Sequence, residues 1–292
     1  MATDPLEQFS DALADRLAEA ASFTVGIRTG RRDRSGILWR DDVVVTSEQV
    51  LPDSTDFTVV RHGVEMPARL AGRDPGTNVA VLRLAQGVAR ARPETSATPR
   101  PGSLALIVGA GPTGRLAMVH ATGPEWHSMA GGRIDTLLRL DARLGEDEGG
   151  PVLTLGGQLI GLSTSGPRRR ALVIPASTVE RVLEPLLTNG RIPRGWLGVG
   201  LQQVLVPDRL REAAGRDNGL MVVALVPNAP AEQAGVLPGD IILEVDGRRT
   251  GRGRGLAAAL GPDRIGQPTT LKLVRAGEVH LVTVIMGTHP TR

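Results

Sequence analysis

Short apolar runs separated by glycine, proline and acidic residues recur along residues 23–175 of the chain. The first of these runs are FTVGIRTG, SGILWRDDVVVTS and DFTVVRHG, and similar runs continue to ALVIPAS. Many short strands at nearly regular spacing favour an antiparallel barrel or sandwich over a doubly wound sheet. The segment RPETSATPRPG, residues 92–102, is rich in proline and arginine and divides this region. We therefore expect two β-barrels that join near residues 90–102.

Two helices are predicted outside these strands. Asp4, Pro5 and Glu7 form a typical helix start, with a capping carboxylate, a proline in the first turn and an acid where the helix dipole favours it. The apolar positions that follow are spaced by three and four residues and predict one amphipathic helix: Leu6, Phe9, Leu13 and Leu17. We expect this apolar stripe to pack against its own domain, and a partner is the alternative. A second helix is predicted from Ser177 to about Leu187.

The last hundred residues have a pattern of their own. The runs GWLGVGLQ and GLMVVALVPNAPAEQAGVLPGDIILEVDGRRT are followed by a short helical stretch around GLAAALG. Two closing strands, TTLKLVRAG and VHLVTVIMG, complete this unit. The turn residues around PGDIILEVDG and the proline that opens the helix in NAPAEQAG predict a second compact domain.

Composition narrows the choice of partner. The 292 residues carry a net charge of only +3, and 41% of them are hydrophobic, enough to fill a core in each of two domains. Every basic residue except Lys272 is arginine, so arginine-rich loops are weak evidence for nucleic-acid binding. No stretch reaches the roughly 18 to 20 apolar residues that cross a bilayer. We expect no nucleic-acid and no membrane partner.

The absence of cysteine suits a reducing compartment. The first residues, MATDPLEQFSDALADRLAEAASFTV, are interrupted by acids and have neither the basic start nor the apolar run of a secretory signal. On these grounds we expect a cytoplasmic location.

The combined pattern resembles the HtrA/Deg family of trypsin-like serine proteases, in which a double β-barrel precedes a PDZ domain. The resemblance covers roughly residues 21–290, and VPNAPAEQAGVLPGDIILEVDG is its most specific part. It implies a mainly β fold in which residues 1–20 form a short N-terminal helix and residues 21–187 form a trypsin-like domain of two six-stranded β-barrels. After a linker at 188–194, residues 195–292 form the PDZ domain. Family members commonly trimerise through aromatic residues near the start of the protease domain, where this chain offers little but Phe9 and Phe23, so homo-oligomer formation stays open.

Three segments match the catalytic motifs of that family. TSEQV places Gln49 where the family has its histidine, and DPGTNVAVLRL places Asn78 where the family has its aspartate. EDEGGP matches Gly-Asn-Ser-Gly-Gly-Pro, with Asp147 for the asparagine and Glu148 for the serine nucleophile. The resemblance therefore implies a degenerate triad at Gln49, Asn78 and Glu148.

These three side chains do not supply the usual chemistry of acyl transfer. A hydroxyl nucleophile needs a base, and the amide of Gln49 does not titrate near neutral pH. Asn78 is neutral and cannot stabilise an imidazolium. A carboxylate at position 148 would repel a developing oxyanion by up to about 4 kcal/mol at ~4 Å and an effective dielectric constant of ~20. We therefore expect a pseudoprotease and not an enzyme.

Other candidate groups give weaker signals. Ser163 and Ser165 lie near the end of the second predicted barrel, and the sequence shows no base for either. The acidic run Glu146–Glu148 is interpreted either as a cation or arginine-anchoring site or as a solvated loop paired with Arg143. We expect neither a metal nor a cofactor, because no histidine pair has metal-ligand spacing; the five histidines are His62, His120, His127, His280 and His289.

By the same resemblance, Trp196, Leu197, Gly198 and Val199 form the loop that binds a peptide carboxylate. A PDZ groove adds the end of an extended chain as a strand at its sheet edge. In the alternative interpretation, these four residues only fill the domain core. The predicted function is a proteolytically inactive adaptor, scaffold or assembly subunit that binds a protein or a peptide carboxyl terminus. A chaperone-like holder of unfolded proteins and a hydrolase with a non-standard active site are the alternatives.

Overall fold

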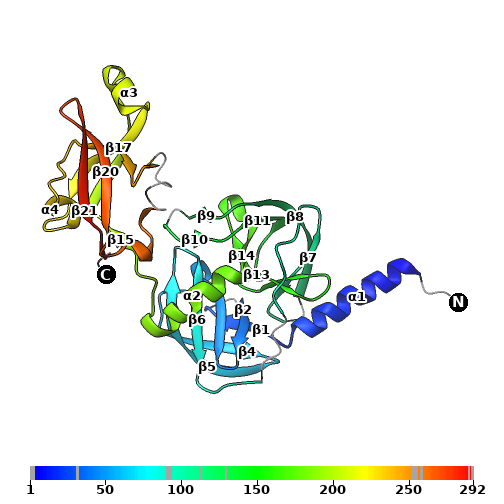
Figure 1. Ribbon diagram of the computed structural model, residues 1–292. Coiled ribbons are helices and arrows are strands. Elements are labelled where there is room, and N and C mark those ends of the chain that lie inside the picture. Colours follow the sequence, from blue (N-terminus) through cyan, green and yellow to red (C-terminus); the bar gives the residue numbers. More distant parts are fainter. Residues whose placement is uncertain are drawn as a thin grey trace. The chain divides into compact units, whose positions relative to one another are not determined.

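The computed structural model describes residues 4–30, 33–89, 94–111, 113–128, 130–250, 256, 259–288 and 290. Contacts divide the chain into two units, residues 1–126 with 134–192, and residues 127–133 with 193–292. The first unit holds two closed barrels and the second holds the C-terminal sheet (Figure 1).

The first barrel closes through six antiparallel strands in the order β1-β2-β3-β6-β5-β4. These strands are β1 (Thr24–Arg28), β2 (Asp33–Arg40), β3 (Val43–Ser47), β4 (Asp56–Arg61), β5 (Val64–Asp74) and β6 (Val79–Leu84). Closure comes from the pairing of Gly26 with Val60 between β1 and β4, which leaves the sheet without an open edge. Inward apolar side chains such as Ile37, Val59 and Leu82 are fully buried and fill the barrel.

The second barrel repeats this plan in the order β11-β14-β13-β12-β7-β8. Its strands are β7 (Leu104–Gly109), β8 (Thr113–Gly123), β11 (Leu137–Arg143), β12 (Pro151–Thr154), β13 (Leu159–Ser165) and β14 (Arg170–Pro175). The short strands β9 (Trp126–His127) and β10 (Arg133–Ile134) pair with each other. The predicted pair of six-stranded barrels is confirmed.

Helix α1 (Pro5–Ala20) begins as predicted, since the Leu6 amide donates to Asp4 Oδ1 over 3.0 Å. The prediction that its whole apolar stripe packs on its own domain is wrong, because Leu6 is 76% exposed and Phe9 is 43% exposed. Only the C-terminal part, with Leu17 and the buried Ala20, joins the barrel core. Amphipathic spacing shows which face of a helix is apolar, but it does not show how far along the helix a partner extends.

Helix α2 (Ala176–Asn189) follows the second barrel and ends at Gly190, which takes a left-handed conformation. Its buried residues Val179, Val182 and Leu186 recur at three- and four-residue spacing, so one face packs into the core of the first unit. Two 3-10 turns complete this unit, η1 (Glu48–Val50) and η2 (Pro167–Arg169).

The C-terminal unit contains a sheet in the order β16-β17-β18-β20-β21, with β19 paired to β18. Its elements are β15 (Gly195–Trp196), β16 (Val199–Leu205), α3 (Asp208–Ala214), β17 (Asn218–Leu225), α4 (Pro230–Gln233), β18 (Ile241–Val245), β19 (Arg248–Arg249), η3 (Pro262–Arg264), β20 (Pro268–Arg275), β21 (Glu278–Ile285) and β22 (Gly287–Thr288). Of the helix predicted around GLAAALG, Leu256 and Ala259 are helical, and Gly255, Ala257 and Ala258 lie outside the described residues.

The turn before β18 is fixed by the buried carboxylate of Asp240, which accepts from the Leu237 amide over 2.8 Å and from Arg275 Nε over 2.8 Å. The hydrogen bond to Asp240 raises the pKa of the Arg275 guanidinium above its ordinary value. The Gly-Asp element of the sequence therefore ties the turn to strand β20.

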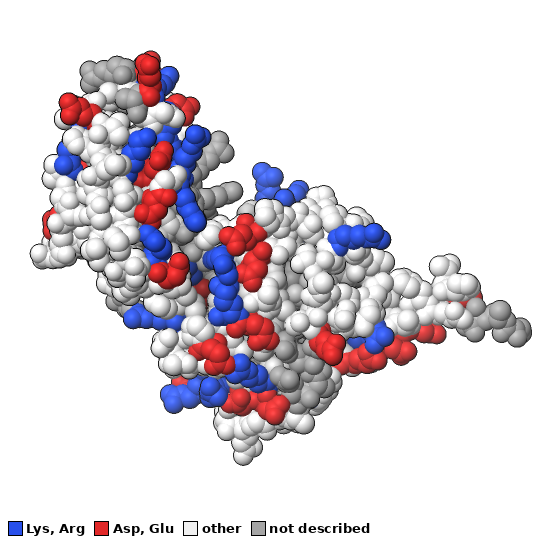
Figure 2. Space-filling model, in the orientation of Figure 1, with Lys and Arg blue, Asp and Glu red and all other residues white. Residues whose placement is uncertain are grey.

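Basic and acidic side chains are interspersed on the face drawn in Figure 2. None of the helices in the described part of the chain combines the length and the apolar character needed to cross a membrane.

Candidate functional site

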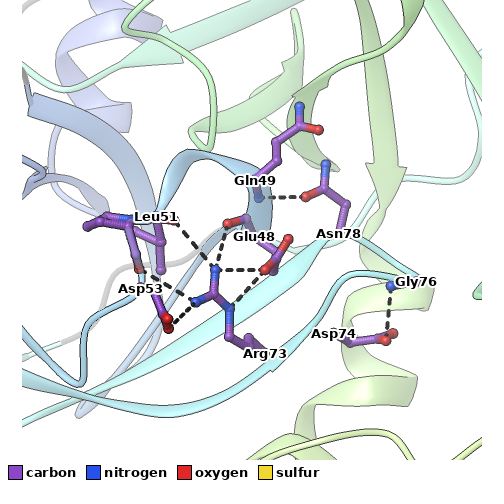
Figure 3. Close-up of polar contacts among 9 residues, drawn as sticks. Glu48, Gln49, Leu51, Asp53, Arg73, Asp74, Gly76 and Asn78 are labelled. Atoms are coloured by element: carbon purple, nitrogen blue, oxygen red, sulfur yellow. Dashed lines mark hydrogen bonds and ion pairs between the residues drawn. The ribbon is translucent and has the colours of Figure 1, made fainter. Parts of the chain in front are cut away.

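The first site residue, Asn78, stands at the end of a tight turn between β5 and β6 (Figure 3). The buried carboxylate of Asp74 accepts from the amides of Gly76 and Thr77 over 3.1 and 3.0 Å and so folds the turn. Asn78 then adopts a φ of 57°, a left-handed conformation that asparagine tolerates better than most residues. This conformation directs its carboxamide toward η1.

Gln49 lies in η1, directly after β3. Arg73 holds this turn, because its Nε donates to Glu48 Oε1 over 2.8 Å (Figure 3). The Gln49 amide donates to Asn78 Oδ1 over 2.9 Å. The contact between the first two predicted positions therefore runs from the backbone of Gln49 to the side chain of Asn78.

Glu148 lies in a loop shaped by two glycines. Gly149 has a φ of 93°, and a Cβ there would lie 2.2 Å from the Ser35 carbonyl oxygen. A Cβ on Gly150 would lie 2.0 Å from the Val108 carbonyl oxygen. Only glycine fits these two positions, and the close packing leaves the residue Glu148 8% exposed.

The carboxylate of Glu148 is the centre of a hydrogen-bond network. Its Oε1 accepts from Gln49 Nε2 and from the Ser165 amide, the latter over 2.8 Å. Its Oε2 accepts from Ser165 Oγ over 2.7 Å. Three donors from two separate segments thus converge on this one carboxylate.

The same Gln49 Nε2 also donates to the Ser165 carbonyl over 3.0 Å. Both backbone polar groups of Ser165 are therefore engaged by site side chains, the amide by Glu148 and the carbonyl by Gln49. These bonds fix the end of strand β13 against the first barrel.

Thr164 connects Asn78 to this network. Asn78 Nδ2 donates to Thr164 Oγ1, which also lies 3.1 Å from Ser47 Oγ and 3.2 Å from Gln49 Nε2. The structure thus brings Gln49, Asn78 and Glu148 together around the end of β13. Sequence reasoning missed Thr164 altogether and found no base for Ser165, because β13 comes more than ten residues after the glutamate along the chain.

The acidic run Glu146–Glu148 is only partly solvated, since Glu146 alone is exposed. Asp147 and Glu148 are buried, and Asp147 pairs with Arg115 over 3.1 Å instead of with Arg143. The other oxygen of Asp147 accepts from the Gly145 amide over 2.6 Å. Asp147 therefore holds the loop closed, and within the described ranges no three Asp, Glu or His side chains converge as metal ligands do.

The predicted peptide loop, Trp196 to Val199, connects β15 to β16. The Leu197 carbonyl accepts from the Ala231 amide over 2.9 Å, and the Gly198 carbonyl accepts from the Val226 amide over 2.9 Å. In the part of the chain that the structure describes, the amides of Leu197 and Gly198 donate no hydrogen bond. The carbonyls are thus bound inside the domain, while these two successive amides have no acceptor among the described residues.

Gly198 sets the shape of this loop. It has a φ of 77°, and a Cβ there would lie 2.1 Å from the Ala229 Cβ. The Leu197 side chain is buried in the domain core, and Val199 packs against the same core. In the alternative interpretation the loop side chains only fill the domain core, and the Leu197 side chain does so. That interpretation gives no role to the two backbone amides.

Profiles of two known domain families match the chain, the Trypsin-like peptidase domain over residues 34–162 and the PDZ domain over residues 195–286. A relative from Rhizobium meliloti (strain 1021), named a probable periplasmic serine endoprotease, DegP-like, is 30% identical over 268 residues. The chain has the two domains of the HtrA/Deg-like family in the same order and resembles that family over most of its length. A relative of the same name from Brucella suis biovar 1 (strain 1330) is 29% identical over 270 residues, which make up 87% of this chain. This HtrA/Deg-like chain spans about half the length of the curated relatives it matches, 52% in both cases.

Solved structures agree with this family. The HtrA-type protease AlgW with tripeptide has a TM-score of 0.73 and 26% identity, over 96% of this chain and 98% of that one. The serine endoprotease from Yersinia pestis has a TM-score of 0.68 at 24% identity, which supports the fold.

These relatives contradict three predictions made from the sequence. The predictions of a proteolytically inactive adaptor and of a chain that is not an enzyme disagree with relatives named serine endoproteases and HtrA-type proteases. The residue types at the three motif positions do not reveal the hydrogen bond between Ser165 and Glu148, which depends on the fold of the barrel. The predicted cytoplasmic location disagrees with relatives named periplasmic. Lack of cysteine is compatible with several compartments and could not decide the location.

Proposed function

We propose that the PDZ domain of this HtrA/Deg-like chain binds the carboxyl end of a peptide at the loop formed by Trp196, Leu197, Gly198 and Val199. The observation that carries this proposal is the pair of amides, on Leu197 and Gly198, that donate no hydrogen bond among the described residues. Successive backbone N–H groups in a loop that includes a left-handed residue form a concave site for an anion. A terminal carboxylate fits this site and satisfies both donors.

The strand that follows the loop supports the same ligand. Strand β16 is the terminal strand of the sheet, paired on one side with β17. A terminal strand offers its free backbone groups to an added strand, and alternate side chains of the added peptide then reach the protein surface. The peptide would run along β16 with its last residue at the loop. The solved structure of the HtrA-type protease AlgW includes a tripeptide, which supports a peptide as the class of ligand.

Binding of matched peptides tests the proposal. We would measure the Kd of the full chain for decapeptides that end in leucine, valine or phenylalanine, each made with a free and with an amidated carboxyl end. Amidation removes the charge from two hydrogen bonds that are worth about 1.5–3 kcal/mol each. If only one such increment is lost, the amidated peptide binds about 10- to 100-fold more weakly. Equal Kd values for the two forms would rule out carboxylate recognition.

Two glycine variants control for folding. Gly198→Ala places a Cβ against Ala229 and distorts the loop, so free-acid binding is expected to disappear. Gly215→Ala also substitutes a glycine with positive φ in the same unit, but a Cβ there meets nothing within 4 Å. Gly215→Ala is therefore expected to keep the wild-type Kd, which separates loop geometry from general strain.

A second candidate function is hydrolysis of an acyl bond at Ser165. The observation that favours it is the 2.7 Å hydrogen bond from Ser165 Oγ to Glu148 Oε2, which lies within the reach required of a general base. Gln49 Nε2 and the Ser165 amide hold the other carboxylate oxygen. A nucleophile, its base and a third group that orients the base are the parts of an activated nucleophile. The names of the relatives support the same reaction class.

In this reaction, Ser165 Oγ attacks the carbonyl carbon and forms the new bond, while its proton passes to Glu148. Glu148 then gives that proton to the leaving group as the acyl bond breaks. Water repeats the cycle and releases the acyl group from Ser165. Gln49 takes no proton and acts as a donor that orients Glu148.

A fluorophosphonate probe and casein hydrolysis test this candidate. We expect labelling at Ser165, loss of both signals in Ser165→Ala, and a fall of about 100- to 10,000-fold in rate in Glu148→Gln. Ser54→Ala removes a hydroxyl whose bond to the Asp56 carbonyl lies in a turn of the first barrel, so this variant serves as the control. Hydrolysis that survives in Ser165→Ala would refute the assignment without affecting the proposal for the PDZ domain.

A further inference from the structure

A pocket of about 280 Å³ lies in the second barrel, next to the end of β13. Its lining comes from β11, from η2 with the preceding glycine, and from β14, and we call it the arginine pocket: Arg139, Gly166, Pro167, Arg168, Arg170 and Leu172. Strand pairing explains the assembly, since Arg139 on β11 is in register with Leu172 on β14. Gly166 follows Ser165 directly, but no lining residue belongs to the hydrogen-bond network of Glu148.

Arg139 carries a buried donor without an acceptor. Its Nε is buried and makes no hydrogen bond. An unsatisfied buried donor costs about 1–3 kcal/mol, and more when it is charged, so such groups are rare in folded proteins. Among all described residues, only Trp126 and Arg216 also carry a buried side-chain donor of this kind. The Arg139 guanidinium thus lines the pocket with one donor that no acceptor in the described part of the chain satisfies.

The other two arginines of the pocket also lack partners. Within the described ranges, the guanidinium groups of Arg139, Arg168 and Arg170 form no hydrogen bond and no ion pair. Many arginines elsewhere in the same unit do pair, for example Arg73 with Glu48 and Arg115 with Asp147. Three like charges around one small pocket repel one another, so the pocket favours a negative ligand.

The loop that carries Arg168 is held in an unfavourable backbone conformation. Arg168 and Arg169 have φ values of 60° and 57°. A left-handed conformation costs a residue with a Cβ about 1–2 kcal/mol, and two in succession are uncommon. The strain is located in the segment that brings Arg168 to the pocket. Backbone strain of this kind gathers at ligand-binding segments.

We propose that the arginine pocket binds an oxyanion, either a carboxylate or a phosphate group. Guanidinium groups match the planar face of a carboxylate or the edge of a phosphate with two parallel hydrogen bonds. The volume of about 280 Å³ leaves room for a small anionic group. Neither candidate function relies on this site, and the inference stands independently of both.

The test uses the full chain and follows the Nε–H resonance of Arg139 by NMR. Sodium phosphate is titrated against sodium chloride at equal ionic strength, and acetyl-Ala-Glu-Ala-amide is titrated against acetyl-Ala-Gln-Ala-amide. The blocked ends of the two peptides leave the glutamate side chain as the only carboxylate. We expect a saturable shift with at least one of the two anions and no saturable shift with chloride or the glutamine peptide.

Substitutions assign the binding to the pocket. Arg168 is exposed, so Arg168→Gln is expected to fold normally and to weaken the Kd by about tenfold or more, the equivalent of one charge-assisted hydrogen bond. Arg100→Gln makes the same charge change at an exposed residue outside the lining and is expected to change the Kd by less than about twofold.

Each outcome decides the proposal. Saturation by phosphate alone identifies a free anion site, and saturation by the glutamate peptide alone identifies a site for an acidic side chain. If phosphate and the glutamate peptide both give saturable shifts, the pocket binds an oxyanion whether it is a free anion or an acidic side chain. Linear shifts equal to those in chloride, or equal losses in Arg168→Gln and Arg100→Gln, would overturn the proposal.

Discussion

Replacement of Glu148 measures how strongly the site network stabilises the barrels. The carboxylate accepts three hydrogen bonds in an environment that leaves the residue 8% exposed. In Glu148→Ala, Gln49 Nε2 keeps two acceptors, Thr164 Oγ1 and the Ser165 carbonyl. The amide and the hydroxyl of Ser165 lose their partner. Two partly buried donors without acceptors correspond to a loss of about 3 kcal/mol in the free energy of unfolding.

Glu148→Gln keeps the shape and removes the charge. Its carbonyl oxygen can still accept from Gln49 and from the Ser165 amide, and its new amide can donate to the Ser165 hydroxyl, which accepts as readily as it donates. We expect the free energy of unfolding of Glu148→Gln to fall by about 1 kcal/mol, because three charge-assisted hydrogen bonds become neutral ones. For a domain of this size, 1 kcal/mol shifts Tm by about 2–4 °C, so the alanine variant should melt about 6–12 °C lower and the glutamine variant about 2–4 °C lower.

Differential scanning calorimetry of the full chain provides the Tm values, and hydrogen exchange of the Ser165 amide reports the local bond. Glu146→Ala is the matched control, since Glu146 is exposed and its described contact is made by its carbonyl oxygen. It should stay within about 0.5 kcal/mol of the wild type. A Glu148→Ala variant as stable as the wild type would show that desolvation of the carboxylate offsets its three bonds, and the reasoning would fail.

Four further substitutions are expected to change the free energy of unfolding by different amounts. Gly149→Ala should lower the free energy of unfolding by more than about 4 kcal/mol, because the new Cβ would overlap Ser35. Gly111 also has a positive φ, 75°, but a Cβ there meets open space, so Gly111→Ala should lower it by only about 1–2 kcal/mol. Urea unfolding of the two variants provides the comparison. Asp240→Asn should destabilise the PDZ domain by about 2–3 kcal/mol, measured by urea unfolding, since it weakens the buried acceptor of Arg275. Leu17→Ala should cost about 2 kcal/mol in the same assay if α1 packs only through its last turns, and an unchanged midpoint would contradict that packing.

Much of the fold could be predicted from the sequence because the signals are local. Alternating apolar runs separated by turn residues specify strands wherever one face is buried, and the Gly-Asp turn at Asp240 is read directly from the sequence. The extent of packing is not local. Leu6 and Phe9 satisfy the helical spacing as well as Leu17 does, yet they remain exposed. Periodicity gives the face of a helix but not the length of its contact.

The candidate site could be predicted only in part for the same reason. Motif spacing located Gln49, Asn78 and Glu148, and the structure brings these three residues together. Ser165 reaches Glu148 through the pairing of β12 with β13, which places residues far apart in the sequence side by side. No motif connects the two residues, so sequence reasoning could name this serine but could not provide its base. The arginine pocket likewise depends on the register between β11 and β14.

The second candidate function also accounts for what first looked like the loss of every catalytic group. Relative to the family motifs, Asn78 replaces the aspartate carboxylate, and Glu148 supplies a carboxylate at another position. Glu148 also replaces the serine hydroxyl, and Ser165 carries a hydroxyl elsewhere in the chain. The structure holds this carboxylate and this hydroxyl 2.7 Å apart. No imidazole stands between them, so a carboxylate would have to remove the serine proton directly, and Gln49 would orient that carboxylate in place of the histidine. Labelling at Ser165 therefore decides whether the three substitutions exchange the roles of these groups or end the chemistry.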